Sequence, residues 1–286
     1  MKNNKSFKEA QKAAAKKAEE LNCSCLIQSG SSLREEDFAP GSDLDLLALF
    51  DEEKEERWGH DHSDGLEISM MKESKTKFLD GLKEGDPFEL MALKFGKVRR
   101  DDGFLKDLDR SKYSPTERTH EVWIRSGLNQ YSKMINNNLY PIDFYNAAYH
   151  SFRSFSRTIL LKEKEVIEER DKRIKEELAD LDEKASDYFW SLRKDRFDIP
   201  KDDASEVFDG LKNDKTVKRV EYMGEKAMSE RGKIFPSYER LEREDSRGLR
   251  MFPRDRERID FSVLEDEGYE LFEFNMETGE MKAVRK

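Results

Sequence analysis

Residues 23–50, CSCLIQSGSSLREEDFAPGSDLDLLALF, decide the fold of the N-terminal part. They hold two apolar runs of strand length, residues 23–29 and 44–50, and the second is the most apolar run among the first hundred residues. Between them stand a small-residue turn, Gly30-Ser31, and a polar stretch that ends in Pro40-Gly41. We therefore expect two buried strands joined by a turn and a loop.

Strands and helices alternate on both sides of this stretch. We expect helices over residues 5–21, 72–84 and 87–95, further strands over 66–71 and 97–100, and a charged connection over 51–64. Asp86 is suited to the N-cap of the helix that Pro87 opens. This alternation predicts an α/β or α+β domain over residues 1–110.

The pattern becomes helical after Ser114. Apolar residues at three- and four-residue spacing predict helices over 116–138, 142–167, 168–193, 202–211 and 215–229, packed as a bundle in a second domain, residues 111–235. We expect residues 236–286 to form a charged linker over 239–258 and a terminal β-hairpin over 269–285. The apolar residues on both faces of that hairpin indicate that it packs on the bundle or on a second subunit, so a homodimer is possible.

Composition excludes several classes of protein. The chain has 286 residues, of which 41% are charged and 36% hydrophobic, and its net charge is −10. A core can form, while a broad duplex-binding surface is unexpected in so acidic a chain. We find no apolar run of membrane-span length and no signal-peptide core, and the closely spaced Cys23 and Cys25 fit small core residues. We expect a cytoplasmic protein without a membrane partner.

Three carboxylates stand where the predicted strands begin. Because side chains alternate along a strand, Asp43 and Asp45 project from one face, and Glu67, flanked by Leu66 and Ile68, offers a third carboxylate on a neighbouring strand. Acidic groups next to an apolar run are costly unless something neutralises them, and Mg²⁺ is the divalent cation that suits carboxylate oxygens together with phosphate.

The turn at Gly30-Ser31 has the properties of a phosphate cradle. It follows a strand and precedes a predicted helix. Glycine allows close approach of the backbone, free amides attract phosphate, and the Ser31 hydroxyl adds a donor. Together with the carboxylates, this turn would equip the protein for attack on a nucleotide phosphorus.

The combination of Gly30-Ser31, eleven intervening residues that end in Ser42, and then Asp43-Leu44-Asp45 resembles the motif of the DNA polymerase β-like nucleotidyltransferases. The resemblance implies an α+β fold with a mixed sheet for the N-terminal domain. Within that superfamily the chain is similar to the minimal, archaeal-type members. Residues 85–96 and 101–104 also resemble the stretch that follows the motif in those members, so the resemblance covers about residues 23–108. The helices after it resemble a HEPN-like bundle, but no Arg and His stand at the spacing of HEPN-type ribonucleases, so we assign no nuclease activity.

The resemblance implies transfer of a nucleoside monophosphate from an NTP to an acceptor hydroxyl, with release of pyrophosphate. It implies that the nucleotide binds at Gly30, Ser31, Arg34 and Ser42, and that two Mg²⁺ ions bind at Asp43, Asp45 and Glu67, which would be the catalytic residues. ATP is the default donor. The acidic middle of the gap, residues 34–37, departs from the family's pattern, and we expect its carboxylates to face solvent.

The sequence does not decide which molecule accepts the nucleoside monophosphate. A protein or a small molecule fits an acidic chain better than RNA. Two other functions are compatible with the same motif: a non-catalytic nucleotide- or partner-binding module of a toxin–antitoxin-like system, and an RNA-tailing nucleotidyltransferase.

Two further acidic or histidine-containing motifs have ordinary structural explanations. The sequence His60-Asp61-His62 is interpreted as part of a charged loop rather than as a zinc site. Glu163, Glu165, Glu168 and Glu169 are expected to share the solvated face of one helix.

Overall fold

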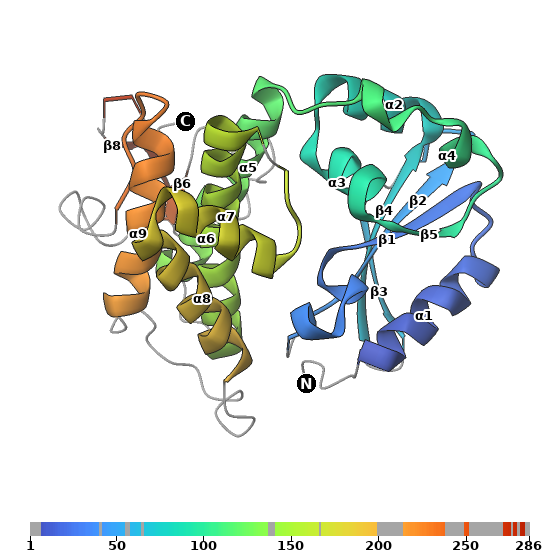
Figure 1. Ribbon diagram of the computed structural model, residues 1–286, viewed down its shortest axis with the longest axis horizontal. Helices are drawn as coiled ribbons and strands as arrows, with labels where there is room; N and C mark the ends of the chain where they lie inside the picture. The colour runs from blue at the N-terminus through green and yellow to red at the C-terminus, as the bar shows by residue number, and fades with distance from the viewer. Residues whose placement is uncertain are drawn as a thin grey trace. The chain divides into compact units, whose positions relative to one another are not determined.

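The computed structural model describes residues 7–39, 42–54, 58–63, 66–136, 141–165, 167–198, 214–237, 249–251, 271–275, 277–278 and 281–283. The chain divides into two compact units, Met1–Val122 with Ile167–Ile174, and Trp123–Val166 with Lys175–Lys286. The first unit carries the mixed sheet, and the second is mainly helical (Figure 1). The fold is therefore α+β.

The first unit is built on a five-stranded sheet with the strand order β3-β4-β2-β1-β5. Its strands are β1 (Cys25–Ser29), β2 (Leu44–Phe50), β3 (Trp58–Ser63), β4 (Leu66–Ser74) and β5 (Lys97–Arg100). Strand β2 pairs antiparallel with β1 and parallel with β4, so the sheet is mixed. The predicted strands at β1, β2, β4 and β5 are confirmed.

Helices cover both faces of this sheet (Figure 1). Helix α1 (Phe7–Glu20) buries Ala10 and Ala14 in one cluster with alternate residues of the strands, Leu44, Leu46, Ile68 and Met70. Helices α2 (Lys75–Glu84) and α3 (Pro87–Phe95) cover the other face, where the cluster holds Ile27, Leu47, Leu49, Met71, Phe78 and Leu90. The strands are thus apolar on both faces, as expected for a sheet between two helical layers.

The boundary between α2 and α3 follows from local chemistry. Gly85 ends α2 in the left-handed conformation, with φ of 77°. Asp86 caps α3 by accepting a hydrogen bond of 3.0 Å from the amide of Phe88, and Pro87 opens the helix. The predicted cap is confirmed.

Helix α3 also buries an acidic side chain. Glu89 is 1% exposed. Burial, a hydrogen bond with Asp86 and the nearby carboxylate of Glu73 raise the pKa of Glu89 to about 9. Glu89 is therefore protonated at neutral pH.

The charged stretch after β2 is not simply a connection. Residues 58–63 form β3, which pairs antiparallel with β4 at the edge of the sheet, so that His60 lies opposite Ser69 and Asp61 opposite Ile68. The interpretation of His60-Asp61-His62 as loop was wrong. An edge strand can carry charged side chains, because charge at an edge opposes pairing with another chain.

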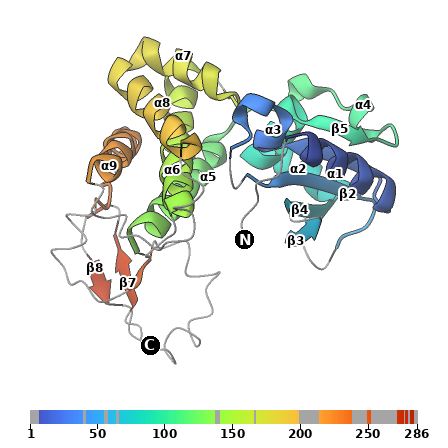
Figure 2. The same cartoon turned by 90° about the horizontal axis from the view of Figure 1, so that it is seen from below.

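The second unit is a group of helices around α6 (Pro141–Lys164), which contacts α8 (Glu183–Phe197) and α9 (Asp214–Ser229) (Figure 2). Helix α5 (Glu117–Asn136) begins in the first unit and α7 (Asp171–Leu181) ends in the second. The apolar stripe of α6 belongs to the core, with Ala148, Tyr149, Phe152, Phe155 and Ile159 at most 2% exposed. Among the helices that the structure describes, none has the length and apolar character needed to cross a membrane.

The single helix predicted over 168–193 is two helices, α7 and α8. Asp182 separates them, because its carboxylate caps α8 by accepting a hydrogen bond of 3.0 Å from the amide of Ala185. The same carboxylate accepts hydrogen bonds from Tyr222 Oη at 2.8 Å and Lys226 Nζ at 2.7 Å on α9. The break in the helical pattern thus also ties α8 to α9.

The C-terminal strands are short. β6 (Leu249–Met251) pairs parallel with β7 (Leu271–Phe274), and β7 pairs antiparallel with β8 (Met281–Ala283). β6 lies inside the stretch interpreted as a linker, 239–258, most of which lies outside the described residues, as does the predicted helix over 202–211. The hairpin over 269–285 falls partly outside them too and stays a prediction, as do the domain boundaries after residues 110 and 235.

Candidate functional site

Gly30 and Asp45 lie in direct contact. The antiparallel register of β1 and β2 places Ser29 opposite Asp45, and Gly30 follows at the start of a short 3-10 helix, Gly30–Leu33. Gly30 has φ of 71°, a left-handed conformation that favours glycine. A Cβ atom at this position would lie 2.1 Å from Asp45 Oδ2. Glycine is therefore required both by the turn and by the carboxylate beside it.

The predicted carboxylates share one face of two neighbouring strands. In the parallel register of β2 and β4, Leu44 lies opposite Ile68 and Asp45 opposite Ser69. Asp43, Asp45, Glu67 and Ser69 are half-buried, and they alternate with the buried Leu44, Leu46, Ile68 and Met70. Ser69 Oγ donates a hydrogen bond of 2.7 Å to Asp43 Oδ2. The strands thus bring the three carboxylates to one end of the sheet.

Asp43, Asp45 and Glu67 do not converge to metal-binding distance. Within the described residues, one group of three His, Cys, Asp or Glu side chains has ligand atoms all within 4.8 Å of one another, and it consists of Cys25, Asp101 and Asp102. The hydroxyl of Ser69 holds Asp43, and the backbone of Gly30 lies against Asp45.

The Cys25 group is explained by the fold. Asp101 accepts hydrogen bonds from the amides of Gly103, Leu105 and Lys106, at 3.0 to 3.1 Å, at the start of α4 (Phe104–Asp107). Asp102 pairs with Lys75 Nζ at 2.6 Å. Burial raises the pKa of the Cys25 thiol to about 12, so the thiol stays protonated and is a poor metal ligand. Both cysteines are buried, as predicted.

A network of polar side chains holds the backbone of the Gly30 turn in place. Gln28 is fully buried, and its Nε2 donates to the carbonyl oxygen of Ser32 at 2.7 Å and to Ser32 Oγ at 3.0 Å. Gln11 Nε2 on α1 donates to the same carbonyl at 2.6 Å. Arg99 Nε on β5 donates to Gln28 Oε1 at 2.8 Å. Three elements therefore fix the backbone that follows Gly30.

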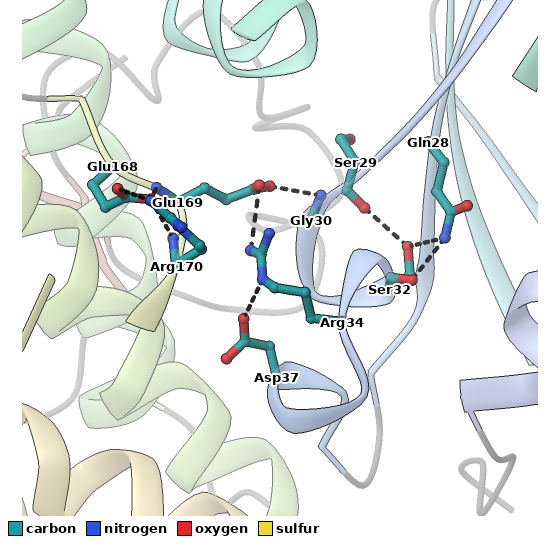
Figure 3. A network of polar contacts seen from close by, with 9 residues as sticks. All are labelled: Gln28, Ser29, Gly30, Ser32, Arg34, Asp37, Glu168, Glu169 and Arg170. Atoms are coloured by element: carbon teal, nitrogen blue, oxygen red, sulfur yellow. Dashed lines mark hydrogen bonds and ion pairs between the residues drawn. The ribbon is translucent and has the colours of Figure 1, made fainter. Parts of the chain in front are cut away.

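The carboxylate of Glu169, 139 residues along the chain from Gly30, binds the backbone of the Gly30 turn. The amide of Gly30 donates a hydrogen bond of 2.9 Å to Glu169 Oε1, and Arg34 Nη2 lies 3.4 Å from Glu169 Oε2 (Figure 3). Arg34 Nε also pairs with Asp37 Oδ2 at 2.7 Å. The side chains of Glu169 and Asp37 are 4% and 8% exposed. Two of the groups predicted to hold phosphate, the Gly30 amide and Arg34, thus bind an anionic oxygen.

These contacts correct two predictions. Glu168 and Glu169 do not share a solvated helix face with Glu163, because both lie between α6 and α7 and are buried. In the acidic gap, Glu35 and Glu36 are exposed as predicted, whereas Asp37 is buried and paired with Arg34.

The remaining predicted nucleotide contacts are Ser31 and Ser42. Ser31 is half-buried within the 3-10 turn, and its carbonyl oxygen accepts a hydrogen bond from the amide of Arg34. Ser42 is 4% exposed, and its Oγ accepts a hydrogen bond of 3.0 Å from the amide of Ala39. This contact gives Ser42 a structural role in the loop before β2, and its contact with nucleotide stays a prediction.

Sequence reasoning missed five residues around the turn: Gln11, Gln28, Ser69, Arg99 and Glu169. For two of these residues the sequence pattern could have indicated a role at the site. Gln28 interrupts an apolar strand, and Ser69 follows Glu67 with strand spacing. Glu169 is 139 residues from Gly30, and the pattern gave no such indication for it.

Comparisons with known proteins support no assignment of a family or a function to this chain. No protein-family model matches the chain, and no curated protein matches it. A solved nucleotidyltransferase-like protein from Exiguobacterium sibiricum 255-15 matches over 98% of this chain and 99% of its own, with 14% sequence identity and a TM-score of 0.30. A similarity at this TM-score supports no functional conclusion.

Proposed function

We propose that the protein is a metal-dependent nucleotidyltransferase, which transfers a nucleoside monophosphate from an NTP, by default ATP, to an acceptor hydroxyl. One observation carries the proposal: the amide of Gly30 hydrogen-bonds a carboxylate oxygen, while its α-carbon lies against the carboxylate of Asp45. An anion-binding amide thus stands next to an acidic strand end. This is the pairing that a triphosphate with its cation requires.

The donor set fits Mg²⁺ in its chemistry. Asp43 and Asp45 offer hard oxygen ligands from one face of the chain at the start of β2, and Glu67 offers a third from β4. When bound, Mg²⁺ would neutralise triphosphate charge and lower the pKa of the acceptor hydroxyl.

The chain's own groups would position the substrates. The Gly30 amide, the Ser31 hydroxyl and Arg34 would bind phosphate oxygens. The acceptor oxygen forms a bond to the α-phosphorus, the bond from that phosphorus to the bridging oxygen breaks, and pyrophosphate leaves with the bond's electrons. Glu67 would accept the proton of the acceptor hydroxyl.

The acceptor is proposed to be a protein or a small molecule. The net charge of −10 weighs against RNA, because binding of a polyanion depends on a basic surface.

The test is transfer of label from NTPs labelled at the α-phosphorus, incubated with the protein, Mg²⁺ and cell extract. Protein, RNA and small-molecule fractions are then separated. We expect label in one fraction, and its loss in the Asp43→Asn/Asp45→Asn variant. The exposed pair Asp80→Asn/Asp107→Asn removes the same charge away from the turn and is expected to retain transfer. Equal labelling by wild type and the Asp43/Asp45 variant, or none by either, would refute the proposal.

A second candidate function is a non-catalytic nucleotide-binding module. It is favoured by the finding that Asp43, Asp45 and Glu67 do not bring three oxygens within 4.8 Å of one another. It predicts binding of Mg²⁺–ATP without release of pyrophosphate, which a pyrophosphate assay distinguishes from the transferase.

A further inference from the structure

The Gly30 amide and the Arg34 guanidinium together bind both oxygens of one carboxylate. Glu169 Oε1 accepts from the amide at 2.9 Å and Oε2 lies 3.4 Å from Arg34 Nη2 (Figure 3). The Glu169 side chain is 4% exposed, so this contact is shielded from water. Charge-assisted hydrogen bonds of this kind are among the stronger polar contacts in proteins.

The backbone around Glu169 holds it in this position. Glu168 Oε1 accepts hydrogen bonds from the amides of Glu169 at 2.8 Å and Arg170 at 2.9 Å. The Glu168 carboxylate also pairs with the Arg170 guanidinium at 3.1 Å. Ile167 packs against the core cluster beneath α2 and α3. The short segment 167–170 is thus anchored on both sides of Glu169 within the first unit.

Glu169 and a nucleotide phosphate would require the same donors. The single N–H of Gly30 points at Glu169, and the charge of Arg34 is shared between Glu169 and Asp37. A phosphate therefore meets occupied donors until Glu169 withdraws.

We infer that Glu169 is an intramolecular competitor of the phosphate group, and that it sets the affinity of the Gly30–Arg34 position for anions. The inference rests on the proposed function for the identity of the ligand, a nucleoside triphosphate. The competition itself is a property of the anion position and can be measured without turnover.

The experiment measures binding of inorganic tripolyphosphate, and separately of Mg²⁺–ATP, by titration calorimetry. The variants are Glu169→Gln, which keeps the shape and removes the charge, and Glu169→Ala. The matched control is Glu163→Gln, which removes the same charge from an exposed position near the end of α6. Thermal unfolding of each variant reports separately on any structural role of Glu169.

We expect both Glu169 variants to bind tripolyphosphate about ten- to a hundredfold more tightly than wild type, since one charge-assisted contact no longer has to be displaced. The Glu163→Gln variant should match wild type. In an Arg34→Gln background the gain should largely disappear, because the competing contact and the phosphate contact are lost together. A contact that only stabilises the fold would change the unfolding temperature without this gain.

The outcomes separate the two proposals. Unchanged or weaker tripolyphosphate binding in the Glu169 variants, including no binding by any of them, overturns the inference. Tighter tripolyphosphate binding without transfer of label from any NTP leaves the competition established and refutes the nucleotidyltransferase function. Tighter binding of both probes with increased transfer at low NTP concentration supports both.

Discussion

Replacement of Gly30 by alanine is expected to destabilise the protein by about 2 to 5 kcal/mol. Two effects contribute. A side chain in the left-handed conformation, here with φ of 71°, costs about 1 to 2 kcal/mol. The new Cβ would also lie 2.1 Å from Asp45 Oδ2, and overpacking of this kind costs about 1 to 3 kcal/mol. Both the turn and the carboxylate would have to shift.

A double-mutant cycle separates the two effects. Urea unfolding, followed by circular dichroism, gives the free energy of unfolding for wild type, Gly30→Ala, Asp45→Ala and the double variant. We expect the double variant to recover the overpacking cost, a coupling of about 1 to 3 kcal/mol. Gly232→Ala is the matched control, because Gly232 has φ of 65° and an added Cβ there meets nothing within 4 Å. Effects of Gly30→Ala and Asp45→Ala that add within about 0.5 kcal/mol would refute the contact on which the site is built.

Substitutions at three other positions test the first unit. The pKa of Glu89 is raised to about 9. The stabilisation that protonated Glu89 gives the folded state is therefore fully present below pH 4.5 and is lost as the pH rises through 9. Glu89→Gln should therefore be more stable than wild type by up to about 3 kcal/mol at pH 7, with a flatter unfolding temperature between pH 6 and 9; parallel pH profiles would contradict this. Asp101→Ala removes the acceptor of three amides at the start of α4 and should cost about 1 to 2 kcal/mol in urea unfolding, whereas Asp101→Asn should cost less. Ser69→Ala removes the hydrogen bond to Asp43 and should change the free energy of unfolding by about 1 kcal/mol while lowering label transfer; unaltered transfer would show that Ser69 does not position Asp43.

The sheet was largely predictable from sequence, because its strands lie between two helical layers and are apolar on both faces. β2 was predicted to the residue, and so were α3 and β5. β3 was missed because its charged residues 60–62 have no apolar periodicity, and its existence depends on pairing with β4. Such an edge strand is defined by its neighbour rather than by its own sequence.

The candidate site was predictable only in its local part. Spacing along the chain placed Gly30 near the strand that carries Asp45, and the structure brings them into contact. Asp37 and Glu169 were assigned to solvent because acidic residues in charged stretches are usually exposed. Both are instead buried beside Arg34, and periodicity contains no information on such a distant ion pair.

The separation of 139 residues between Gly30 and Glu169 also has a consequence during protein synthesis. A ribosome adds about 5 to 20 residues per second, so Glu169 is made about 7 seconds or more after Gly30. During that interval the nascent chain contains the Gly30 turn, and soon afterwards β2 and β4, but not the carboxylate that binds the turn. Under the proposed function, a phosphate compound could occupy the newly made turn before Glu169 is synthesised, and a bound anion at that stage would favour early folding of the sheet.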